Sequence, residues 1–189
     1  TEEGIKKYST EEFRYFLNLI WEQLSDKEIN SILYLVVQGG TKVKEGTNLG
    51  ITDNATLIEF LKICSEFGKN SKEHNGDYLK AEEIKDKLDL GLSSINIAPE
   101  FGSIESEVYI SEFSQEDIFK FLDLVIDSKR WIKWFNKDFK PKENKELLLK
   151  MCGHYVFEYA EFKEIKQRYS LELDKKIIKK IKDKVLEII

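Results

Sequence analysis

A short apolar run at residues 32–37 (Ile-Leu-Tyr-Leu-Val-Val) constrains the fold of this chain more than any other feature. The run is rich in residues that favour strands, and Gln38 and the Gly39-Gly40 pair end it at once. A continuous apolar run of this length is typical of a strand that is buried on both faces. Such strands belong to parallel sheets, so the run predicts a parallel sheet covered by helices.

Helical and strand patterns alternate around this run. Ser9 and Glu12 form a capping box at the start of a first amphipathic helix. The elements expected next are a helix at residues 53–67, a short strand at 69–75, a helix at 81–90 and a strand at 92–98. Strands that alternate with helices at these spacings form βαβ units with right-handed crossovers, so the fold class is predicted to be α/β.

After Pro99 the pattern changes to helices only. We expect helices at residues 114–126, 131–135, 142–157 and 171–189. The last of these places Leu171, Ile178 and Val185 at one heptad position, which indicates a docking face, and its many lysines are interpreted as a solvated face. Without a repeat or a low-complexity linker, residues 1–189 are expected to form a single domain, with βα units to residue 113 and C-terminal helices from 114.

Composition excludes several classes of protein. Hydrophobic residues make up 41% and charged residues 34%, which argues against a disordered chain, and no apolar run approaches the ~20 residues of a membrane span. A net charge of -5 gives no general attraction to nucleic acid. We also expect a cytoplasmic protein, because no secretory signal opens the chain, and buried free thiols at Cys64 and Cys152.

Polar side chains gather where the predicted strands end, which is where parallel α/β folds bind ligands. At the first strand end, Gln38 precedes Gly39 and Gly40, whose backbone amides are able to approach an anion closely. A plain glycine turn is the alternative. The first strand end is therefore a candidate for binding substrate and phosphate.

The second strand end carries Glu73, His74, Asn75, Asp77 and Tyr78 where a buried strand should be apolar. Burying an unpaired charge costs several kcal/mol, so folding alone does not explain this cluster. His74 is a candidate general base or metal ligand, oriented by Glu73 or Asp77. A solvated loop of mutually paired charges is the alternative.

The third strand end carries Asn96, which alternation is expected to turn inward between Ile95 and Ile97. Glu100 follows Pro99 and is a candidate acid or base, with helix capping as the alternative. A catalytic zinc needs three protein ligands, whereas the chain has only His74 and His154, and we interpret His154 as a packing residue.

At these three strand ends the sequence resembles the C-terminal part of the non-catalytic subunit family of class II D-tagatose-bisphosphate aldolase. Residues 36–40 resemble the sixth strand of that family, residues 73–78 the seventh and residues 95–100 the eighth. Residues 131–135 and 155–166 are similar to its C-terminal helices. The resemblance implies the last three βα units of a TIM (β/α)8 barrel followed by an all-helical C-terminal region, with the other strands before Thr1.

The resemblance also implies a protein of carbohydrate metabolism that acts on a sugar or sugar phosphate by aldol cleavage or epimerisation. An activity of the class II aldolase type favours a divalent metal such as zinc, with His74 as its candidate ligand. A homo-oligomer or an aldolase partner subunit is also expected. The family has a small residue where His74 stands and an apolar stretch where Glu100 stands, which favours an activity of this chain's own. The alternative is a non-catalytic subunit that stabilises a catalytic aldolase partner. The expected catalytic residues are Glu73, His74, Asp77 and Glu100, and the expected substrate-binding residues are Gln38, Gly39, Gly40, Asn75, Tyr78 and Asn96.

Overall fold

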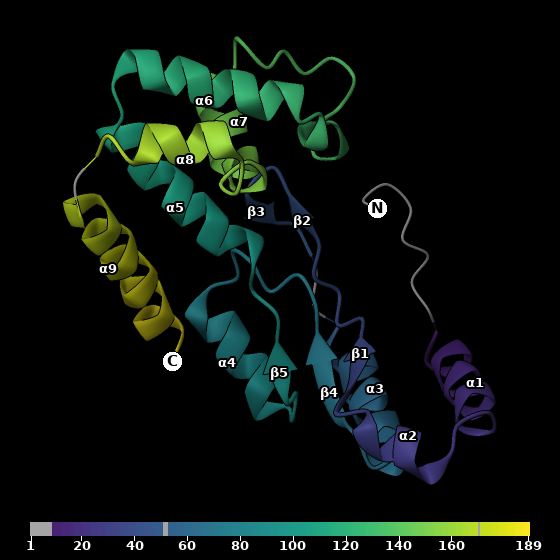
Figure 1. Cartoon of the computed structure of the whole chain (residues 1–189). Helices are drawn as coiled ribbons and strands as arrows, with labels where there is room; N and C mark the ends of the chain where they lie inside the picture. The colour runs from purple at the N-terminus through teal and green to yellow at the C-terminus, as the bar shows by residue number, and fades with distance from the viewer. Residues whose placement is uncertain (1–8, 51–52, 170) are drawn as a thin grey trace. The chain divides into compact units, whose positions relative to one another are not determined.

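A computed structural model describes residues 9–50, 53–169 and 171–189 (Figure 1). The described chain forms two compact units that divide between Ile97 and Ala98. We call residues 9–97 the sheet unit and residues 98–189 the helical unit, and each is described by itself. The single domain expected for residues 1–189 stays a prediction.

The sheet unit begins with two helices and then alternates strands with helices. Its elements are α1 (Thr10–Trp21), α2 (Asp26–Ser31), β1 (Tyr34–Val37), β2 (Val43–Lys44), β3 (Thr47–Asn48), α3 (Asn54–Glu66), β4 (Asn70–Glu73), α4 (Ala81–Asp89) and β5 (Ser94–Ile95). The Ser9 capping box starts α1 as predicted, and the Asp53 side chain accepts hydrogen bonds from the first amides of α3. The sequence missed α2 and the β2–β3 hairpin.

Three of these strands form a parallel sheet in the order β1-β4-β5, which confirms the predicted parallel pairing. Helix α3 packs against one face of the sheet, where Leu35 and Val37 of β1 share a core with Leu57 and Phe60 of α3. Phe13 of α1 meets Phe60 edge to face at 5.2 Å between ring centroids. This covered face holds the apolar core of the sheet unit.

The opposite face of β1 is open in this unit. Tyr34 is 41% exposed and Val36 48%, whereas Leu35 and Val37 between and beside them are buried. The prediction that this strand is buried on both faces is therefore wrong. Its side chains alternate with period two, and the apolar character of every position hid that alternation in the sequence.

The predicted TIM (β/α)8 barrel is also wrong. A barrel closes its sheet so that no strand is left at an edge. In the described residues the parallel sheet has only three strands, with β1 and β5 at its edges, and the β2–β3 pair forms a separate antiparallel sheet. The chain then continues as helices with a core of their own. The structure is a mixed α/β fold with a small parallel sheet.

The helical unit contains α5 (Pro99–Glu112), α6 (Gln115–Asp127), η1 (Arg130–Lys133), α7 (Lys145–Cys152), η2 (Gly153–Tyr155), α8 (Ala160–Lys166) and α9 (Leu171–Ile188). Pro99 occupies the first turn of α5, where its missing N–H costs nothing. Ser114 caps α6 as predicted, by accepting from the Asp117 amide. The helix predicted at 142–157 is shorter, because it gives way to a 3-10 turn at Gly153.

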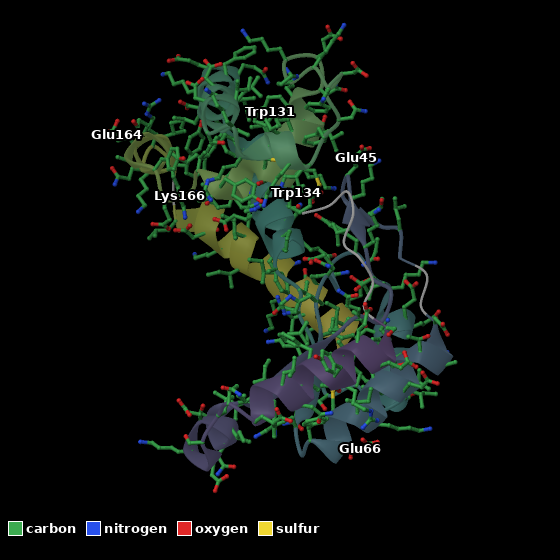
Figure 2. The ribbon with its side chains drawn as sticks, turned by 90° about the vertical axis from the view of Figure 1, so that its right-hand side faces the viewer. Glu45, Glu66, Trp131, Trp134, Glu164 and Lys166 are labelled. Carbon is green, nitrogen blue, oxygen red and sulfur yellow. The ribbon has the colours of Figure 1, made fainter. Side chains whose placement is uncertain are left out.

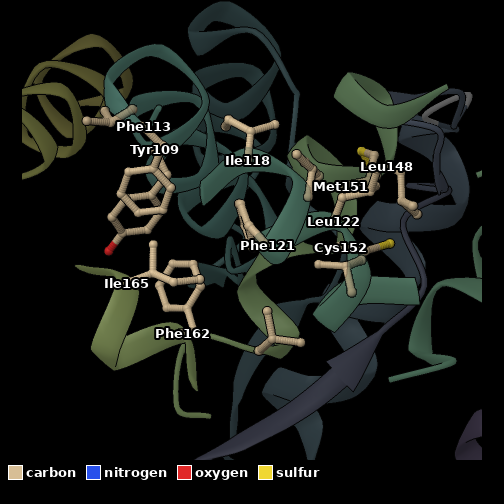
Figure 3. Packing of buried hydrophobic residues seen from close by; sticks show 14 of the residues in the cluster. Tyr109, Phe113, Ile118, Phe121, Leu122, Leu148, Met151, Cys152, Phe162 and Ile165 are labelled. Carbon is tan, nitrogen blue, oxygen red and sulfur yellow. The ribbon is translucent and has the colours of Figure 1, made fainter. Parts of the chain in front are cut away.

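Aromatic side chains from several helices meet within the core of the helical unit, among aliphatic residues (Figure 3). Phe121 of α6 has no exposed surface, and its ring centroid lies 4.9 Å from that of Phe162 on α8. Tyr109 of α5 lies 5.1 Å from the same Phe162 ring. Three helices therefore meet around one aromatic cluster, which accounts for a compact helical unit without a sheet.

Helix α9 contributes to this core through Leu173 and Ile177, which are 4% and 6% exposed. The heptad row that the sequence singled out faces the other way, with Leu171 78% and Ile178 65% exposed. Among the described residues, no helix has the length and apolar character that crossing a membrane requires. Cys64 and Cys152 are buried free thiols, as predicted, and burial raises their pKa values to about 11 and about 12.

Candidate functional site

Three predicted site residues follow neighbouring strands at the same edge of the sheet. In the parallel register Val37 of β1 pairs with Glu73 of β4, and Glu73 pairs with Ile95 of β5. Gln38, His74 and Asn96 are the next residues along each strand. The sheet therefore brings these three positions to one row at its carboxyl edge, where ligands of parallel α/β folds bind.

A buried ion pair involves Glu73, the residue directly before His74. The Lys87 ammonium of α4 donates to Glu73 Oε2 at 2.9 Å, and the two side chains are 2% and 1% exposed. The same ammonium lies 3.5 Å from the Gly39 carbonyl oxygen. The Thr41 amide donates to Glu73 Oε1 at 3.4 Å, so both carboxylate oxygens have partners. Glu73 is thus held inside the protein, and Lys87 is a participant that the sequence analysis missed.

The need for glycine at position 39 follows from this pair. A Cβ atom on Gly39 would lie 2.5 Å from Glu73 Oε1, closer than side-chain atoms approach one another. Gly40 has a φ of 101°, which side chains rarely tolerate. Gly39 therefore makes room for a carboxylate, and Gly40 allows the chain to turn away from the strand.

The turn after β4 is held by donors from other segments. Asn48 Nδ2 donates to the Asn75 carbonyl at 2.8 Å and to the Asp77 carbonyl at 2.9 Å. The Gly76 amide donates to the Asn96 carbonyl at 2.9 Å, and Thr41 Oγ1 lies 2.7 Å from the His74 carbonyl oxygen. These bonds fix the backbone of residues 74–78 in one conformation.

Two residues of this turn adopt an uncommon backbone conformation. Asn75 has a φ of 60° and Tyr78 a φ of 61°. Left-handed backbone is tolerated by asparagine but costs a bulky residue such as tyrosine about 1 kcal/mol or more. Strain of this kind persists only where surrounding contacts enforce it, and it is concentrated at functional sites.

Asn48, which the sequence analysis also missed, hydrogen-bonds to two backbone segments of this region. Its Oδ1 atom accepts from the Lys42 and Gly50 amides, each at 3.1 Å, while its Nδ2 atom holds the 74–78 turn. It lies on β3, after a two-residue turn in which Glu45 and Gly46 both have positive φ. A glycine at the second position of a two-residue turn is a hairpin signal that was present in the sequence.

The predicted residues differ in their access to a ligand. The side chains of His74, Asn75 and Asn96 are exposed, and those of Gln38 and Tyr78 are half-buried. Asp77 is only 2% exposed. The prediction that Asn96 points inward is therefore wrong, because its side chain is exposed. We call Gln38, His74, Asn75, Tyr78 and Asn96 the strand-end cluster.

Glu100 belongs to the helical unit, in the first turn of α5. Its Oε1 atom accepts from the Lys184 ammonium of α9 at 3.0 Å, and the two side chains are 9% and 15% exposed. Glu100 thus has a partner that ties α9 to α5.

The divalent metal expected from the sequence stays a prediction. Across residues 9–50, 53–169 and 171–189, no three His, Cys, Asp or Glu side chains are grouped so that they would hold a metal ion. His154 lies in the helical unit, where burial first and the charge of Lys133 second lower its pKa to about 4. His74 therefore has no companion ligand set in the described chain.

Comparison with known proteins gives a likeness to a solved structure and no match among family models or curated proteins. No protein-family model matches the chain, and no curated protein matches it significantly. A solved structure, described as a probable tagatose 6 phosphate kinase from Sinorhizobium meliloti 1021, is similar with a TM-score of 0.66 and 10% sequence identity. The match covers 95% of this chain and 49% of that one, so this chain spans about half the length of its structural neighbour. At this identity the likeness shows a shared fold.

Proposed function

We propose that this chain acts in carbohydrate metabolism and binds a sugar phosphate at the strand-end cluster. The observation that carries the proposal is the 74–78 turn, whose strained backbone is held by Asn48 and Thr41 while His74 and Asn75 remain exposed. Strain enforced around exposed polar groups at strand ends favours a binding role over a purely structural one. The structural neighbour is a probable tagatose 6 phosphate kinase, and its sugar-phosphate chemistry supports this class of ligand.

The cluster offers the groups that a polyol requires. Gln38, Asn75 and Asn96 carry side-chain amides, each able to donate to one hydroxyl and accept from another. Tyr78 adds a phenolic hydroxyl, and His74 supplies an imidazole ring nitrogen as a candidate proton acceptor. We propose His74 as the general base in an aldol-type cleavage or epimerisation. The buried Glu73–Lys87 pair would act as a positioning element beneath it.

Ligand binding is tested by titrating the isotope-labelled chain with tagatose 6-phosphate and following backbone amide signals. Signals of residues 38–41 and 74–78 are expected to shift, and Asn48→Ala is expected to weaken binding by roughly ten-fold because the turn loses two hydrogen bonds. Thr47→Ala is the control, since Thr47 only bonds within the hairpin. Absence of shifts at millimolar ligand would refute the proposal.

The second candidate function is a non-catalytic subunit that stabilises an aldolase partner. The exposed face of β1 favours it, because Leu33, Tyr34 and Val36 are 67%, 41% and 48% exposed and form an apolar surface beside an open strand edge. Triose phosphate release from tagatose 1,6-bisphosphate by the chain alone, lost in His74→Gln, would support catalysis. Activity that requires an added aldolase chain and survives His74→Gln would support the subunit role.

A further inference from the structure

A strongly basic segment joins α6 to α7 in the helical unit. Residues 129–145 contain seven lysine or arginine residues and two acidic residues, in a chain whose net charge is -5. Aromatic residues are interleaved with these charges, among them Trp131 and Trp134 (Figure 2). With seven basic and two acidic residues, the segment therefore carries a local charge of +5, although the chain as a whole is negative.

Two cations of this segment converge on one aromatic ring. The Arg130 guanidinium carbon lies 5.6 Å from the ring centroid of Tyr155, and the Lys133 ammonium lies 5.1 Å from the same centroid. The Lys133 ammonium also lies 5.2 Å from the ring of Trp134, whose indole N–H donates to the Tyr155 hydroxyl at 2.9 Å. The 3-10 turn η1 and the 3-10 turn η2 together hold this arrangement.

The convergence leaves like charges close together without compensation. Within the part of the chain that the structure describes, neither Arg130 nor Lys133 pairs with a carboxylate. Because both lie over one ring, their charges are within roughly one Debye length of each other, about 10 Å at 0.1 M salt. Attraction to an aromatic face offsets only part of this repulsion. An anion between the two cations would remove it.

We infer that Arg130, Lys133 and Tyr155 form a binding site for the phosphate group of a small phosphate monoester. Arg130 supplies a planar fork that matches two phosphate oxygens, and Lys133 adds a compact positive charge. The Tyr155 hydroxyl accepts the indole N–H of Trp134, and its own proton has no acceptor among the described residues. That proton is therefore available to a third phosphate oxygen.

The same geometry disfavours single-stranded nucleic acid as the ligand. Bases bind such proteins by stacking on aromatic faces. Lys133 already lies over the rings of Trp134 and Tyr155, and Phe135 is buried and stacked on Phe139 at 3.8 Å between centroids. His154, beside Tyr155, adds no charge at neutral pH because burial keeps its pKa near 4. The cluster thus presents two positive charges and one hydroxyl to a single anion.

This inference is independent of the proposed function, because all of its residues lie in the helical unit and none belongs to the strand-end cluster. The test is a titration of the full chain with inorganic phosphate at constant ionic strength, followed through tryptophan indole N–H signals in a two-dimensional NMR spectrum. The Trp134 signal is expected to shift and the Trp21 signal to stay. The double variant Arg130→Gln/Lys133→Gln is expected to bind roughly ten-fold more weakly or worse.

The matched control is Lys137→Gln/Lys142→Gln, which removes the same charge from the same segment but touches no aromatic ring. It is expected to bind phosphate within about two-fold of the parent chain. Equal losses in the two double variants would show general attraction and overturn the proposal. So would binding of an eight-residue thymidine oligonucleotide without any response to phosphate, because that result would make the segment a polyanion surface. Arg130→Lys, which keeps the charge but loses the fork, is expected to fall between the parent and the double variant.

Discussion

The sheet unit and the helical unit bury polar groups in different ways. In the sheet unit, Glu73, Asp77 and Lys87 are at most 2% exposed and lie at or next to the strand ends. The helical unit also buries the carboxylates of Glu100 and Asp117, at 7% and 5% exposure, but aromatic rings such as Phe121 and Phe162 pack together in its core. Packed rings need no partner, whereas a buried charge is stable only while its partner remains. The comparison indicates that the sheet unit places buried charged side chains where apolar residues would otherwise extend the core. The pairing of these charges holds the strand ends in place.

The largest effect is expected from removing a central ring of the helical unit. Phe121→Ala deletes a fully buried side chain that contacts Phe162 and Tyr109, and it is expected to destabilise the helical unit by about 3–5 kcal/mol. Hydrogen exchange should then show lost amide protection in α5, α6 and α8, with protection kept in β1 and β4.

The control for this prediction is Phe119→Ala on the same helix, because Phe119 is 52% exposed. It is expected to change stability by less than about 1 kcal/mol. If Phe121→Ala removed amide protection equally from both units, the two units would unfold as one cooperative body. That result would contradict the description of two separate cores.

The polar edge of the sheet unit is tested by breaking its ion pair. Lys87→Met leaves Glu73 buried without its cation and is expected to cost about 3 kcal/mol in urea unfolding. Adding Glu73→Gln removes the stranded charge, so the double variant should regain part of that stability.

Lys184→Met provides the comparison in the helical unit, where the Lys184–Glu100 pair is more exposed and should be worth about 1 kcal/mol. A Lys87→Met variant no less stable than Lys184→Met would mean that the pair does not hold the strand ends together.

The helices and the parallel pairing were predictable because local chemistry specifies them. The capping residues Ser9, Asp53 and Ser114 start helices where expected, and β4 lies within the range predicted for it. The row of Gln38, His74 and Asn96 followed from placing ligand contacts at the ends of parallel strands.

What the sequence did not reveal depends on long-range partners. Lys87 lies with Ile84 on the buried face of α4, and nothing in the local sequence indicates that its ammonium reaches Glu73 in the interior. The barrel expectation came from the family resemblance at the three strand ends, and motifs at strand ends do not determine whether a parallel sheet closes into a barrel. The period-two alternation of β1 was masked by apolar residues on both faces.

Acidification is expected to weaken the helical unit selectively through His154. Burial lowers the pKa of His154 to about 4, below its ordinary value of 6.5. The unfolded chain therefore binds a proton more readily, so the stabilising contribution is complete above about pH 6.5 and is lost as pH falls toward 4. Allowing for partial solvent access, the loss is about 2 kcal/mol.

Urea unfolding between pH 7 and pH 4 measures this dependence. His154→Gln should flatten it for the helical unit, whereas the sheet unit, which does not contain His154, should keep the dependence of the parent chain. An equal slope in the parent chain and in His154→Gln would assign the pH dependence to other groups.

The smallest expected loss of stability distinguishes Gly39 from Gly68, two positions of the sheet unit that require glycine for different physical reasons. At Gly39 a Cβ atom would meet the Glu73 carboxylate at 2.5 Å, and Lys87 prevents that carboxylate from moving aside, so Gly39→Ala is expected to cost about 1–2 kcal/mol. At Gly68 no atom lies within 4 Å of the added carbon, and the cost of about 1 kcal/mol comes only from its φ of +66°.

The two glycine substitutions are distinguished in the Glu73→Ala background, where their costs are measured by urea unfolding. Removing the carboxylate should relieve Gly39→Ala and leave the cost of Gly68→Ala unchanged. If Gly39→Ala stayed equally costly without Glu73, the glycine would serve the backbone and not the buried pair.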